Sequence, residues 1–390
     1  MDIVTNPKID WLGKKWYFIG LSVLLGLAGA VSIMTRGLNL GVDFTGGTLV
    51  YVKFTSTPDL EKIRSALTSG KLEAEEVTRF DEPSANEVQI RMARIESEEA
   101  QDLSVQSKMV TQALFDEFDK AAADGKIDLN GATVSEIANW LQEKDPEGLA
   151  DKMSIDEMAA QAHEQATRIV DFRNAHGGVF KNLAEVDQVN LPAAVTNAIK
   201  ENFYAGAFTV LSVESVGPRV GRELRDRAQN AVLFSLLGML VYIAFRFRPI
   251  YGVAAIVALF HDVFLTVGFF SITGKEISLT VIAALLTLVG YSVNDTIVVF
   301  DRVRENLRLM RRSDMFTVLN TSINQTLNRT ILTSGMTFLA VFALFSLGGE
   351  ALSGFSFALV VGIIVGTYSS IAIASPIVLW WQGYREKRKA

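Results

Sequence analysis

The sequence predicts a polytopic α-helical membrane protein with six transmembrane helices and an extracytoplasmic α+β domain between the first two. Three observations predict this fold class: long apolar runs, a separation of charge along the chain, and a strand-like segment with alternating side chains. Of the 390 residues, 49% are hydrophobic and 21% are charged. Because about 18 apolar residues are enough for a helix to cross a bilayer, the apolar runs define the membrane part.

The six apolar runs cover residues 16–34, 228–245, 251–272, 277–300, 330–348 and 355–381. The first run also fits a cleavable secretory signal, because Lys14 and Lys15 precede it and Ala28-Gly29-Ala30 follows its apolar core. We expect an uncleaved anchor instead, because the five later runs would otherwise insert without their pairing helix.

The charge pattern predicts the orientation in the membrane. Residues 37–219 contain 31 acidic and 17 basic residues, a net charge of −14, so the rest of a chain whose total is −6 carries +8. Lys and Arg collect in cytoplasmic loops. Most of the remaining cations precede the first run or follow the second, fourth and sixth: Lys8, Lys14, Lys15, Arg246, Arg248, Arg302, Arg304, Arg308, Arg311, Arg312, Arg385, Lys387, Arg388 and Lys389. Arg219, Arg222, Arg225 and Arg227 before the second run are the local exception, and an amphipathic helix at the membrane interface could hold them. We therefore expect both termini in the cytoplasm and the acidic domain outside.

This topology divides the chain into three parts. Residues 1–36 hold the cytoplasmic N-terminus and the first transmembrane helix, residues 37–219 form the extracytoplasmic domain, and residues 220–390 hold helices two to six and the basic C-terminus. The chain has no cysteine, so the extracytoplasmic domain must be stable without disulfides.

The extracytoplasmic domain begins with a sheet pattern. Gly46 and Gly47 predict a turn or bulge before a segment whose side chains alternate with the period of two of a strand. The predicted elements are a strand at 48–54, a helix from Pro58-Asp59 to Ser69-Gly70, strands at 75–81 and 87–94 around the turn D-E-P-S-A-N, a helix at about 98–120 and a strand at 208–216. This order is that of a split βαβ, or ferredoxin-like, plan.

Residues 121–206 interrupt that plan. A loop of this length without structure of its own is uncommon, so we expect an inserted helical subdomain. Within it, Arg168–Ile199 resembles the helix-hairpin-helix module, which often binds nucleic acid through a Gly-containing hairpin. Here the hairpin is N-L-P-A-A, and its surroundings are acidic, whereas phosphate binding requires Lys and Arg. We expect a helical packing or protein-contact module and no nucleic-acid partner.

Ionisable residues inside the apolar runs are the candidate functional residues, because each costs about 3 kcal/mol at the centre of a membrane. They are His261 and Asp262 in the third run, Asp295 in the fourth and Arg329 at the start of the fifth. Each of these residues could instead have a purely structural role. His261 and Asp262 could form a pair that holds helices together, and Asp295 and Arg329 could mark the point where helices leave the lipid.

Two polar stripes suggest how these residues meet. Four-residue spacing places side chains on one helical face, and it relates Thr287, Tyr291 and Asp295 in one helix, and Gln325, Arg329, Thr333 and Thr337 in the next. If these stripes face each other, Asp295 lies against Arg329 among hydroxyl groups. A carboxyl whose charge depends on a movable guanidinium could load a proton from one side and release it to the other.

The sixth run carries a stripe of small residues. It consists of Gly354, Ala358, Gly362, Gly366, Ser370 and Ala374, spaced by four. Such a stripe allows another helix to approach closely.

Five motifs together resemble the SecF family of the bacterial Sec preprotein translocase, within the resistance-nodulation-division superfamily. They are G-V-D-F-T-G-G after the first run, V-G-P-R-V-G-R-E-L before the second, H-D-V in the third, G-Y-S-V-N-D-T-I-V-V-F-D-R-V-R-E-N in the fourth and L-N-R-T-I-L-T-S in the fifth. The resemblance covers residues 1 to about 97 and 207–390. The helical insert departs from the compact exterior domain usual in this family.

The resemblance implies a function. It implies a multi-pass protein of the inner membrane that uses the proton motive force to promote late steps of protein export, without enzymatic activity, cofactor or metal. It implies SecD as the other half of the transporter, with the SecYEG channel, the translocating preprotein and membrane lipid as partners.

The resemblance also implies roles for particular residues. In the family, the residues that correspond to Asp295, Arg329 and Thr333 are implicated in proton conduction. We add Asn294, which precedes Asp295 in its motif, and the His261-Asp262 pair to the proton-coupling candidates.

Two other functions are alternatives. The chain could be half of a transporter of the same superfamily that exports a small molecule or lipid. It could also be an intramembrane aspartyl protease that uses Asp262 and Asp295, but such enzymes carry a G-x-G-D sequence and Asp295 follows Y-S-V-N.

Overall fold

The computed structural model describes residues 7–72, 74–80, 85–92, 103–120, 124–150, 152–246 and 249–387. The chain divides into two compact units: a membrane unit of residues 1–45 and 219–390, and a sheet unit of residues 46–218. The described residues do not include 81–84 of the predicted turn, the last residues of the second and third predicted strands, the start of the predicted helix at 98–102, or Arg248, Arg388 and Lys389.

The boundary after Thr45 lies beyond the predicted one at residue 37. The cause is a set of backbone hydrogen bonds between residues 39–41 and the loop before α11. Ile277 N donates to Asn39 O at 2.8 Å, and Gly41 N donates to Ile277 O at 2.9 Å. These bonds tie the segment after the first helix to the membrane unit.

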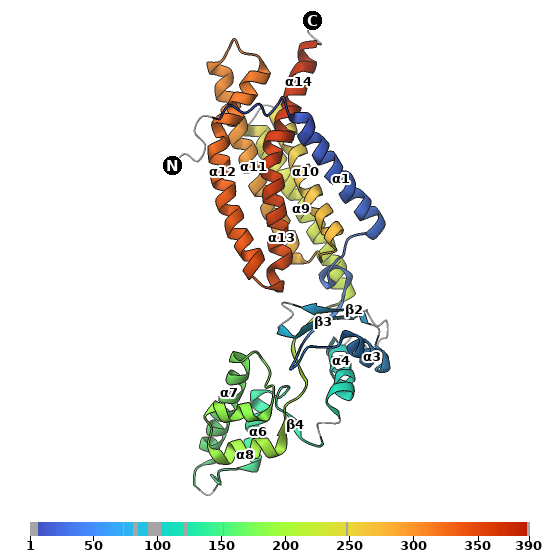
Figure 1. Cartoon of the computed structure of the whole chain (residues 1–390), viewed down its shortest axis with the longest axis vertical. Coiled ribbons are helices and arrows are strands. Elements are labelled where there is room, and N and C mark those ends of the chain that lie inside the picture. The colour runs from blue at the N-terminus through green and yellow to red at the C-terminus, as the bar shows by residue number, and fades with distance from the viewer. Residues whose placement is uncertain are drawn as a thin grey trace. The chain divides into compact units, whose positions relative to one another are not determined.

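The membrane unit is a bundle of long helices (Figure 1). They are α1 (Lys15–Arg36), the short α2 (Val42–Thr45), α9 (Pro218–Arg246), α10 (Pro249–Thr273), α11 (Leu279–Leu309), α12 (Met315–Leu347), α13 (Glu350–Ser369) and α14 (Ser375–Lys387). Helices are expected here because lipid offers no hydrogen-bond partner to the backbone.

Five helical stretches among the described residues are long and apolar enough to cross a membrane: Lys15–Arg36, Pro249–Thr273, Leu279–Leu309, Met315–Leu347 and Ala351–Arg385. The chain is therefore a multi-pass membrane protein. The second predicted run lies within α9, a continuous helix of 29 residues that is not among these five.

Small residues bring α1 and α10 into close contact. A Cβ atom added to Gly29 would lie 3.0 Å from Cα of Gly268, and the reverse distance is 3.1 Å. Near this contact, Ser32 Oγ and Ser271 Oγ are 2.9 Å apart and share a hydrogen bond. The backbones can approach this closely only because both positions lack a side chain.

The predicted small-residue stripe packs α13 against α11, which confirms the expected close approach. A Cβ added to Gly354 would lie 3.0 Å from Val281, one at Gly362 would lie 2.5 Å from Leu288, and one at Gly366 would lie 3.1 Å from Ser292. The stripe then enters a π-helical segment, Ser370–Ala374, between α13 and α14. Pro376 follows it and lacks the N–H that would bond to a preceding carbonyl, which explains the wider turn.

The sheet unit contains a four-stranded antiparallel sheet in the order β2-β3-β1-β6. The strands are β1 (Gly47–Phe54), β2 (Ala74–Phe80), β3 (Glu87–Met92) and β6 (Phe208–Val216). Val50 in the central strand pairs with Ile90 of β3 and Val213 of β6. Gly46 and Gly47, with φ of 75° and 135°, adopt the left-handed conformations expected of a glycine pair before a strand.

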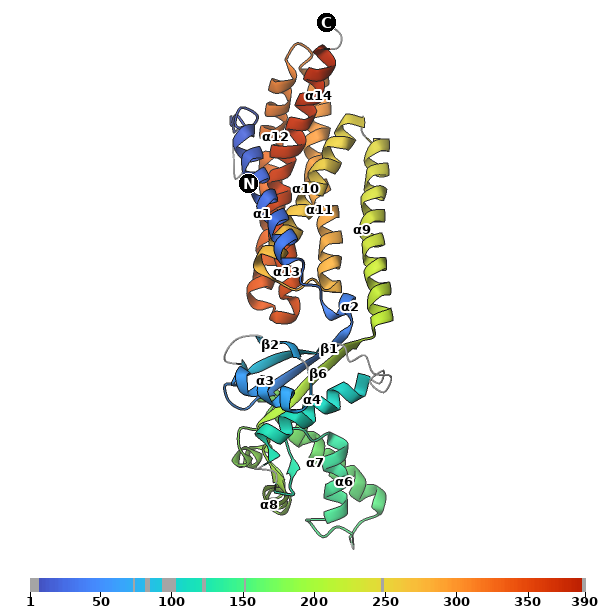
Figure 2. The same ribbon diagram turned by 90° about the vertical axis from the view of Figure 1, so that its right-hand side faces the viewer.

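Two helices, α3 (Leu60–Ser69) and α4 (Leu103–Phe118), lie against one face of this sheet (Figure 2). The side chain of Asp59 caps α3 by accepting from the backbone N–H groups of Glu61 and Lys62, as its position before the apolar face predicted. The shared core includes the fully buried side chains of Val50, Val52, Ile63, Leu67, Ile90 and Leu114.

Residues 124–206 form a helical insert with its own core. Its elements are β4 (Ile127–Asp128), α6 (Val134–Lys144), α7 (Ile155–Ala175), a 3₁₀ helix at Leu183–Val189, α8 (Ala193–Asn202) and β5 (Phe203–Tyr204). The succession of helix, Gly177-Gly178 turn, short helix and second helix is the one expected for Arg168–Ile199. Its core includes Ile137, Ala166, Ile169, Val186, Val195 and Ile199.

Buried polar contacts join the insert to the main sheet. The hydroxyl of Thr209 on β6 donates to the carbonyl of Asn130 at 2.9 Å, and Asn130, which is 0% exposed, donates in turn to the carbonyls of Phe180 and Gly206 at 3.0 and 2.7 Å. At the end of α4, the carboxylate of Asp119 accepts from Ala207 N at 2.7 Å. Residues 206–207 lead directly into β6, so the strand is held from both sides.

We expect Gly29→Leu to destabilise the membrane unit, because the new side chain must enter the contact with the Gly268 backbone. Overpacking of this kind costs about 1–3 kcal/mol. The melting temperature of the purified protein in detergent measures the effect. Gly20→Leu is the matched control on α1, since a Cβ there meets nothing within 4 Å. Equal melting temperatures for the two variants would contradict the close contact.

We expect Asp119 to make the sheet unit less stable as pH rises. Burial raises the pKa of this carboxyl from 3.8 to about 6, partly opposed by the hydrogen bond from Ala207 and reinforced by nearby Asp128. Between about pH 4 and pH 6 the folded state then binds more protons than the unfolded state, so the stability contributed by the neutral carboxyl is lost through this window.

Asp119→Asn removes this titration while its side-chain oxygen still accepts from Ala207. Hydrogen exchange of residues 124–206 in the full chain, followed from pH 4.5 to 7.5, measures local stability. After correction for the intrinsic pH dependence of amide exchange, the ratio of the wild-type exchange rate to that of the Asn variant should increase as pH rises. The control Asp116→Asn removes an exposed carboxyl of α4, which is 49% accessible, and should keep the wild-type profile.

Candidate functional site

Asp262 on α10 is the most deeply buried carboxyl of the membrane unit, at 0% exposure. Its Oδ2 accepts from Ser292 Oγ of α11 at 2.5 Å and from Ser369 Oγ of α13 at 2.8 Å. Its Oδ1 lies 2.9 Å from Nδ1 of His261. A Cβ at Gly366 would lie 3.5 Å from Oδ2, so this glycine leaves room for the contacts. Three helices therefore supply hydrogen bonds to one carboxyl.

The hydrogen bonds continue beyond His261. Its Nε2 lies 3.3 Å from the hydroxyl of Tyr368 on α13, and that hydroxyl shares a short hydrogen bond with Ser22 of α1. The side chain of His261 is 16% accessible, so it lies between the buried carboxyl and the edge of the bundle. Adjacent residues in a helix point in different directions, but the His261 ring nevertheless reaches the carboxyl beside it.

Asp295 on α11 forms a second, simpler site. It is 3% exposed, and Ser334 Oγ of α12 donates to its Oδ2 at 2.8 Å. Asp301, two turns further along α11, is 60% accessible and lies 3.6 Å from Arg246. Asp295 therefore belongs to the interior of the bundle, whereas Asp301 belongs to its end.

The other predicted members of this site lie on the outer face of the helices. Asn294, Arg329 and Thr333 are exposed, and the hydroxyl of Thr333 donates to the carbonyl of Arg329 in its own helix at 2.9 Å. No ion pair within 4 Å joins Arg329 to Asp295 in the described part of the chain, although its charge acts on the carboxyl from a distance.

In the described part of the chain, no hydrogen bond or ion pair joins a member of one predicted stripe to a member of the other. Gln325 accepts from Asn306 at 2.8 Å and from Arg302 at 2.7 Å, both on α11. A four-residue step turns by about 40° around a helix of 3.6 residues per turn. The stripe consequently rotates away from α11 after Gln325, and Ser334 rather than Arg329 or Thr333 is the residue that contacts Asp295.

Apolar runs and stripe spacing do not single out the hydroxyl groups around the two carboxyls. Ser292, Ser334 and Ser369 contact the carboxyls directly, whereas Tyr368 and Ser22 are joined to Asp262 through His261. Serines are frequent in membrane helices, where they often bond to their own backbone, so single occurrences carry little signal. Ser292 lies three residues before Asp295 in the motif and Ser369 lies three residues after Gly366, and these positions were the available indications.

An apolar groove of about 410 Å³ lies beside a residue of each site. Residues of α1, α12 and α13 line it, among them Phe18, Ile331, Phe338 and Ile364. Its polar lining includes Ser334, which bonds to Asp295, and Tyr368, which bonds to His261. One hydroxyl from each carboxyl site therefore reaches the same groove.

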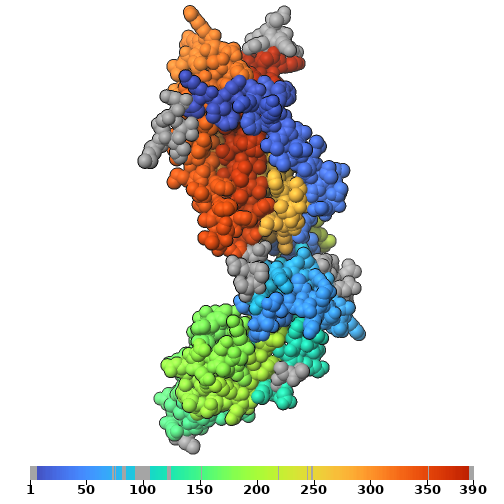
Figure 3. Space-filling view, viewed as in Figure 1, coloured from blue at the N-terminus to red at the C-terminus, as the bar shows by residue number. Residues whose placement is uncertain are grey.

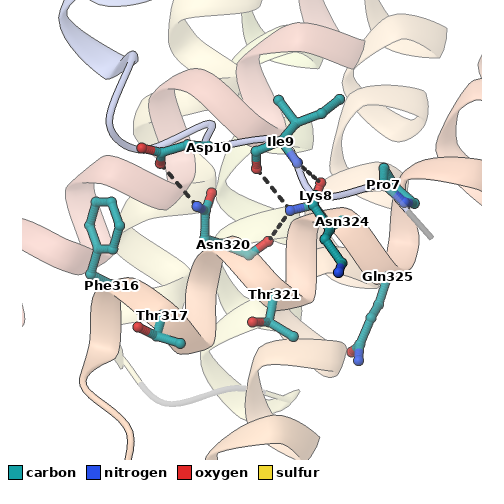
Figure 4. A pocket seen from close by; sticks show the side chains of 10 residues that line it. All are labelled: Pro7, Lys8, Ile9, Asp10, Phe316, Thr317, Asn320, Thr321, Asn324 and Gln325. Carbon is teal, nitrogen blue, oxygen red and sulfur yellow. Dashed lines mark hydrogen bonds between the residues drawn. The ribbon is translucent and has the colours of Figure 1, made fainter.

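A second groove lies where the N-terminal segment, blue in Figure 3, crosses α12 (Figure 4). It measures about 500 Å³ and lies between Pro7–Asp10 and one face of α12. Asn324 accepts from Ile9 N and Trp11 Nε1, both at 3.2 Å, and donates to Ile9 O at 2.8 Å. Asn320 adds bonds to Trp11 N and Asp10, so the segment is held along two turns of the helix.

Among the described residues, no group of three or more His, Asp or Glu side chains could hold a metal ion. The polar centres of the membrane unit are thus carboxyl, imidazole and hydroxyl groups. This chemistry suits the transfer of protons between oxygen and nitrogen atoms.

The fold and these centres define a multi-pass membrane protein with an inserted α+β domain and buried carboxyls in its helices. Residues 195–384 match the family described as "Protein export membrane protein SecD/SecF, C-terminal", and residues 31–58 match the "SecD/SecF GG Motif". The protein translocase subunit SecF of Koribacter versatilis is 46% identical over the whole chain and 95% of its own length. The SecF of Calditerrivibrio nitroreducens is 35% identical over 99% of this chain and 98% of its own. The chain belongs to the SecF family of protein translocase subunits.

Solved structures agree with this assignment. The crystal structure of SecDF from Thermus thermophilus matches 97% of this chain with a TM-score of 0.66 and 31% identity. SecDF in its super-membrane-facing form matches 99% with a TM-score of 0.56. The chain spans 39% and 40% of the length of these two SecDF chains, which therefore contain more than the part compared.

We expect Asn324→Ala to loosen the N-terminal segment, because it removes three hydrogen bonds to Ile9 and Trp11. Hydrogen exchange of residues 7–12 in the full chain should rise by about fivefold or more, the equivalent of about 1 kcal/mol of local stability. Thr321→Ala, which lines the same groove, is the control and should leave exchange unchanged. Wild-type protection in Asn324→Ala would show that the segment is held by other contacts.

Proposed function

We propose that this chain is a proton-coupled subunit of the Sec preprotein translocase, in which uptake and release of a proton at Asp295 promotes late steps of protein export. The observation that carries the proposal is the carboxyl of Asp295, 3% exposed within a candidate membrane span and bonded to Ser334. A carboxylate in such a place is costly unless it is paired or protonated. A change in its surroundings therefore changes its proton affinity.

The exposed polar face beside Asp295 favours the presence of a partner subunit that covers it. Asn294, Arg329 and Thr333 point away from the bundle of this chain, although they lie in candidate membrane spans. A guanidinium facing lipid at the centre of a membrane costs about 3 kcal/mol or more. We propose that a SecD-type half covers this face and brings Arg329 within reach of a carboxyl when the helices move.

Fused relatives support such a partner. The SecDF chain of Thermus thermophilus is 51% identical to this chain over 182 residues, which make up 25% of the fused protein. By the same analogy we propose the SecYEG channel and the translocating preprotein as further partners, with membrane lipid around the remaining helices.

We propose His261 and Asp262 as a second proton-coupling pair. The direct contact of 2.9 Å between them links an imidazole, which can both donate and accept a proton, to a buried carboxyl. The contact also holds the α10 side chains in place, but a purely structural role would not require an ionisable pair where serines already link the helices.

We propose that α9 is a sixth membrane span, so that both termini lie in the cytoplasm and the sheet unit lies outside the inner membrane. Large apolar side chains of α9 support this proposal, because Phe234, Val241 and Phe245 are 67%, 53% and 91% exposed. Charge supports the orientation, since cations collect at the ends of alternate helices. The strand order β2-β3-β1-β6 supports a ferredoxin-like plan for the sheet unit.

We propose a non-enzymatic role. An aspartyl protease needs two carboxyls that share one proton. Asp262 and Asp295 instead have separate donors, Ser292 and Ser369 for the first and Ser334 for the second. This arrangement favours two independent proton sites over one hydrolytic site.

The test is Asp295→Asn in a strain that lacks the wild-type chain. The amide keeps the size of the side chain but cannot titrate, so the variant should assemble normally while export loses its dependence on the proton gradient. Asp301→Asn, an exposed carboxylate on the same helix, is the matched control. Pulse-chase analysis of an exported precursor, with and without an uncoupler, measures the effect.

Normal gradient-dependent export in the Asp295→Asn strain would contradict the proposal. Loss of the chain should also stall exported precursors. If precursors mature normally and a small solute or lipid accumulates instead, the chain is half of a small-molecule exporter.

A further inference from the structure

A chain of hydrogen bonds crosses the membrane unit from its first helix to its centre. It runs from Ser22 on α1 to Tyr368 on α13, then to Nε2 of His261, and from Nδ1 of His261 to Asp262 on α10. The steps that end on nitrogen measure 3.3 and 2.9 Å. Every member of this chain can both give and accept a proton.

We propose that Ser22, Tyr368 and His261 form a proton relay that loads and unloads Asp262, separately from Asp295. This inference deepens the proposed proton coupling and rests on it for its use in export. It names Tyr368 and Ser22 as the residues that determine how fast a buried carboxyl exchanges its proton.

The transfer can be written with every proton accounted for. His261 starts with its proton on Nδ1 and gives it to Oδ1 of Asp262, while Nε2 takes the proton of the Tyr368 hydroxyl. Tyr368 regains a proton from Ser22, and Ser22 takes one from a hydronium ion, which is left as water. Asp262 is then neutral, and the imidazole carries its proton on Nε2. Release of the proton follows the same bonds in reverse.

The surroundings of Asp262 favour this route. Ser292 and Ser369, which donate to the carboxyl, are 2% and 0% exposed, so they shield its Oδ2 from water. In the described part of the chain, the titratable groups in this hydrogen-bonded cluster are His261 from α10 and Tyr368 from α13, whereas α1 and α11 contribute only serine hydroxyls. A proton that reaches Asp262 therefore passes His261.

The middle of the relay lies beside the apolar groove. Tyr368 lines this groove, and Ser334, the partner of Asp295, lines it as well. No hydrogen bond joins Ser334 to Tyr368 among the described residues, so the two carboxyls are reached by separate hydroxyls. The π-helical segment that starts at Ser370 adjoins Tyr368, which places the relay next to an irregular turn that can adjust its register.

Ser22, the first residue of the relay, also links it to the rest of the chain. Ser22 belongs to α1, and α1 continues through residues 37–46 into β1, the central strand of the sheet unit. A change in the Ser22–Tyr368 hydrogen bond thus acts on the helix that leads into that unit. The Ser22–Tyr368 hydrogen bond is therefore part of the path of proton exchange at Asp262 and also a point at which strain on α1 acts.

The experiment measures proton uptake by Asp262 in the purified full chain in lipid nanodiscs. A pH jump is followed by infrared difference spectroscopy of protonated carboxyls, and the signal lost in Asp262→Asn identifies Asp262. We expect Tyr368→Phe and His261→Gln to slow this signal by about tenfold or more, without changing its final amplitude, because each removes a link in proton transfer. Ser22→Ala should slow it in the same direction.

Two matched controls separate a relay from general damage. Tyr17→Phe removes a hydroxyl from a tyrosine of α1 that is 81% exposed, and Ser32→Ala removes the hydroxyl that bonds to Ser271 at the same α1–α10 contact. Both should keep the wild-type rate. Slowing in these controls equal to that in Tyr368→Phe would overturn the relay.

A wild-type rate in Tyr368→Phe, or a carboxyl at position 262 that gives no signal between pH 5 and 9, would also overturn the inference. If Tyr368→Phe changes the amplitude through altered folding, Ser22→Ala decides the outcome. The export assay with Asp295→Asn remains independent: it can fail while the relay stands, and the relay can fail while Asp295 still couples export to the proton gradient.

Discussion

Burial of carboxyl groups among apolar helices is the constraint on which the membrane unit depends. Such a group must find hydrogen-bond donors or hold a proton, because lipid and hydrocarbon side chains provide neither. The donors around Asp262 come from three helices, so those helices must approach one another closely. The glycines of α13 allow this approach: Gly362 lies over Leu288 and Gly366 lies over Ser292. The small-residue stripe of α13 therefore allows both the close packing of the helices and the hydrogen bonds to Asp262.

The two carboxyls differ in how fully they are satisfied, and this difference suits two roles. Asp262 has contacts on both oxygens and is enclosed. Asp295 has a hydrogen bond from Ser334 and adjoins an exposed polar face. We propose that protons pass through the network that holds the first, and that the second responds to a group brought by a partner.

The sheet unit is stabilised in a different way, because it must be stable without disulfides. Its two cores, one under the sheet and one within the insert, are joined by buried polar groups rather than by a continuous apolar layer. The hydroxyl of Thr209 in β6, for example, donates to the carbonyl of Asn130 in the insert at 2.9 Å. Desolvation of Asp119 at this junction lowers the stability of the charged form. The insert is thus attached through contacts that depend on charge.

The sequence by itself determined the elements and the residues of interest. Apolar runs, the capping position of Asp59, the glycine pair before β1 and the small-residue stripe each depend on local chemistry, which is visible along the chain. Asp262 and Asp295 could be singled out because an ionisable residue in an apolar run is rare whatever its neighbours. The tertiary structure decided which side chains meet them. Helix rotation and register are set by the packing of whole helix faces, so Ser334 rather than Arg329 contacts Asp295, and Tyr368 and Ser22, which are 346 residues apart, share one hydrogen bond.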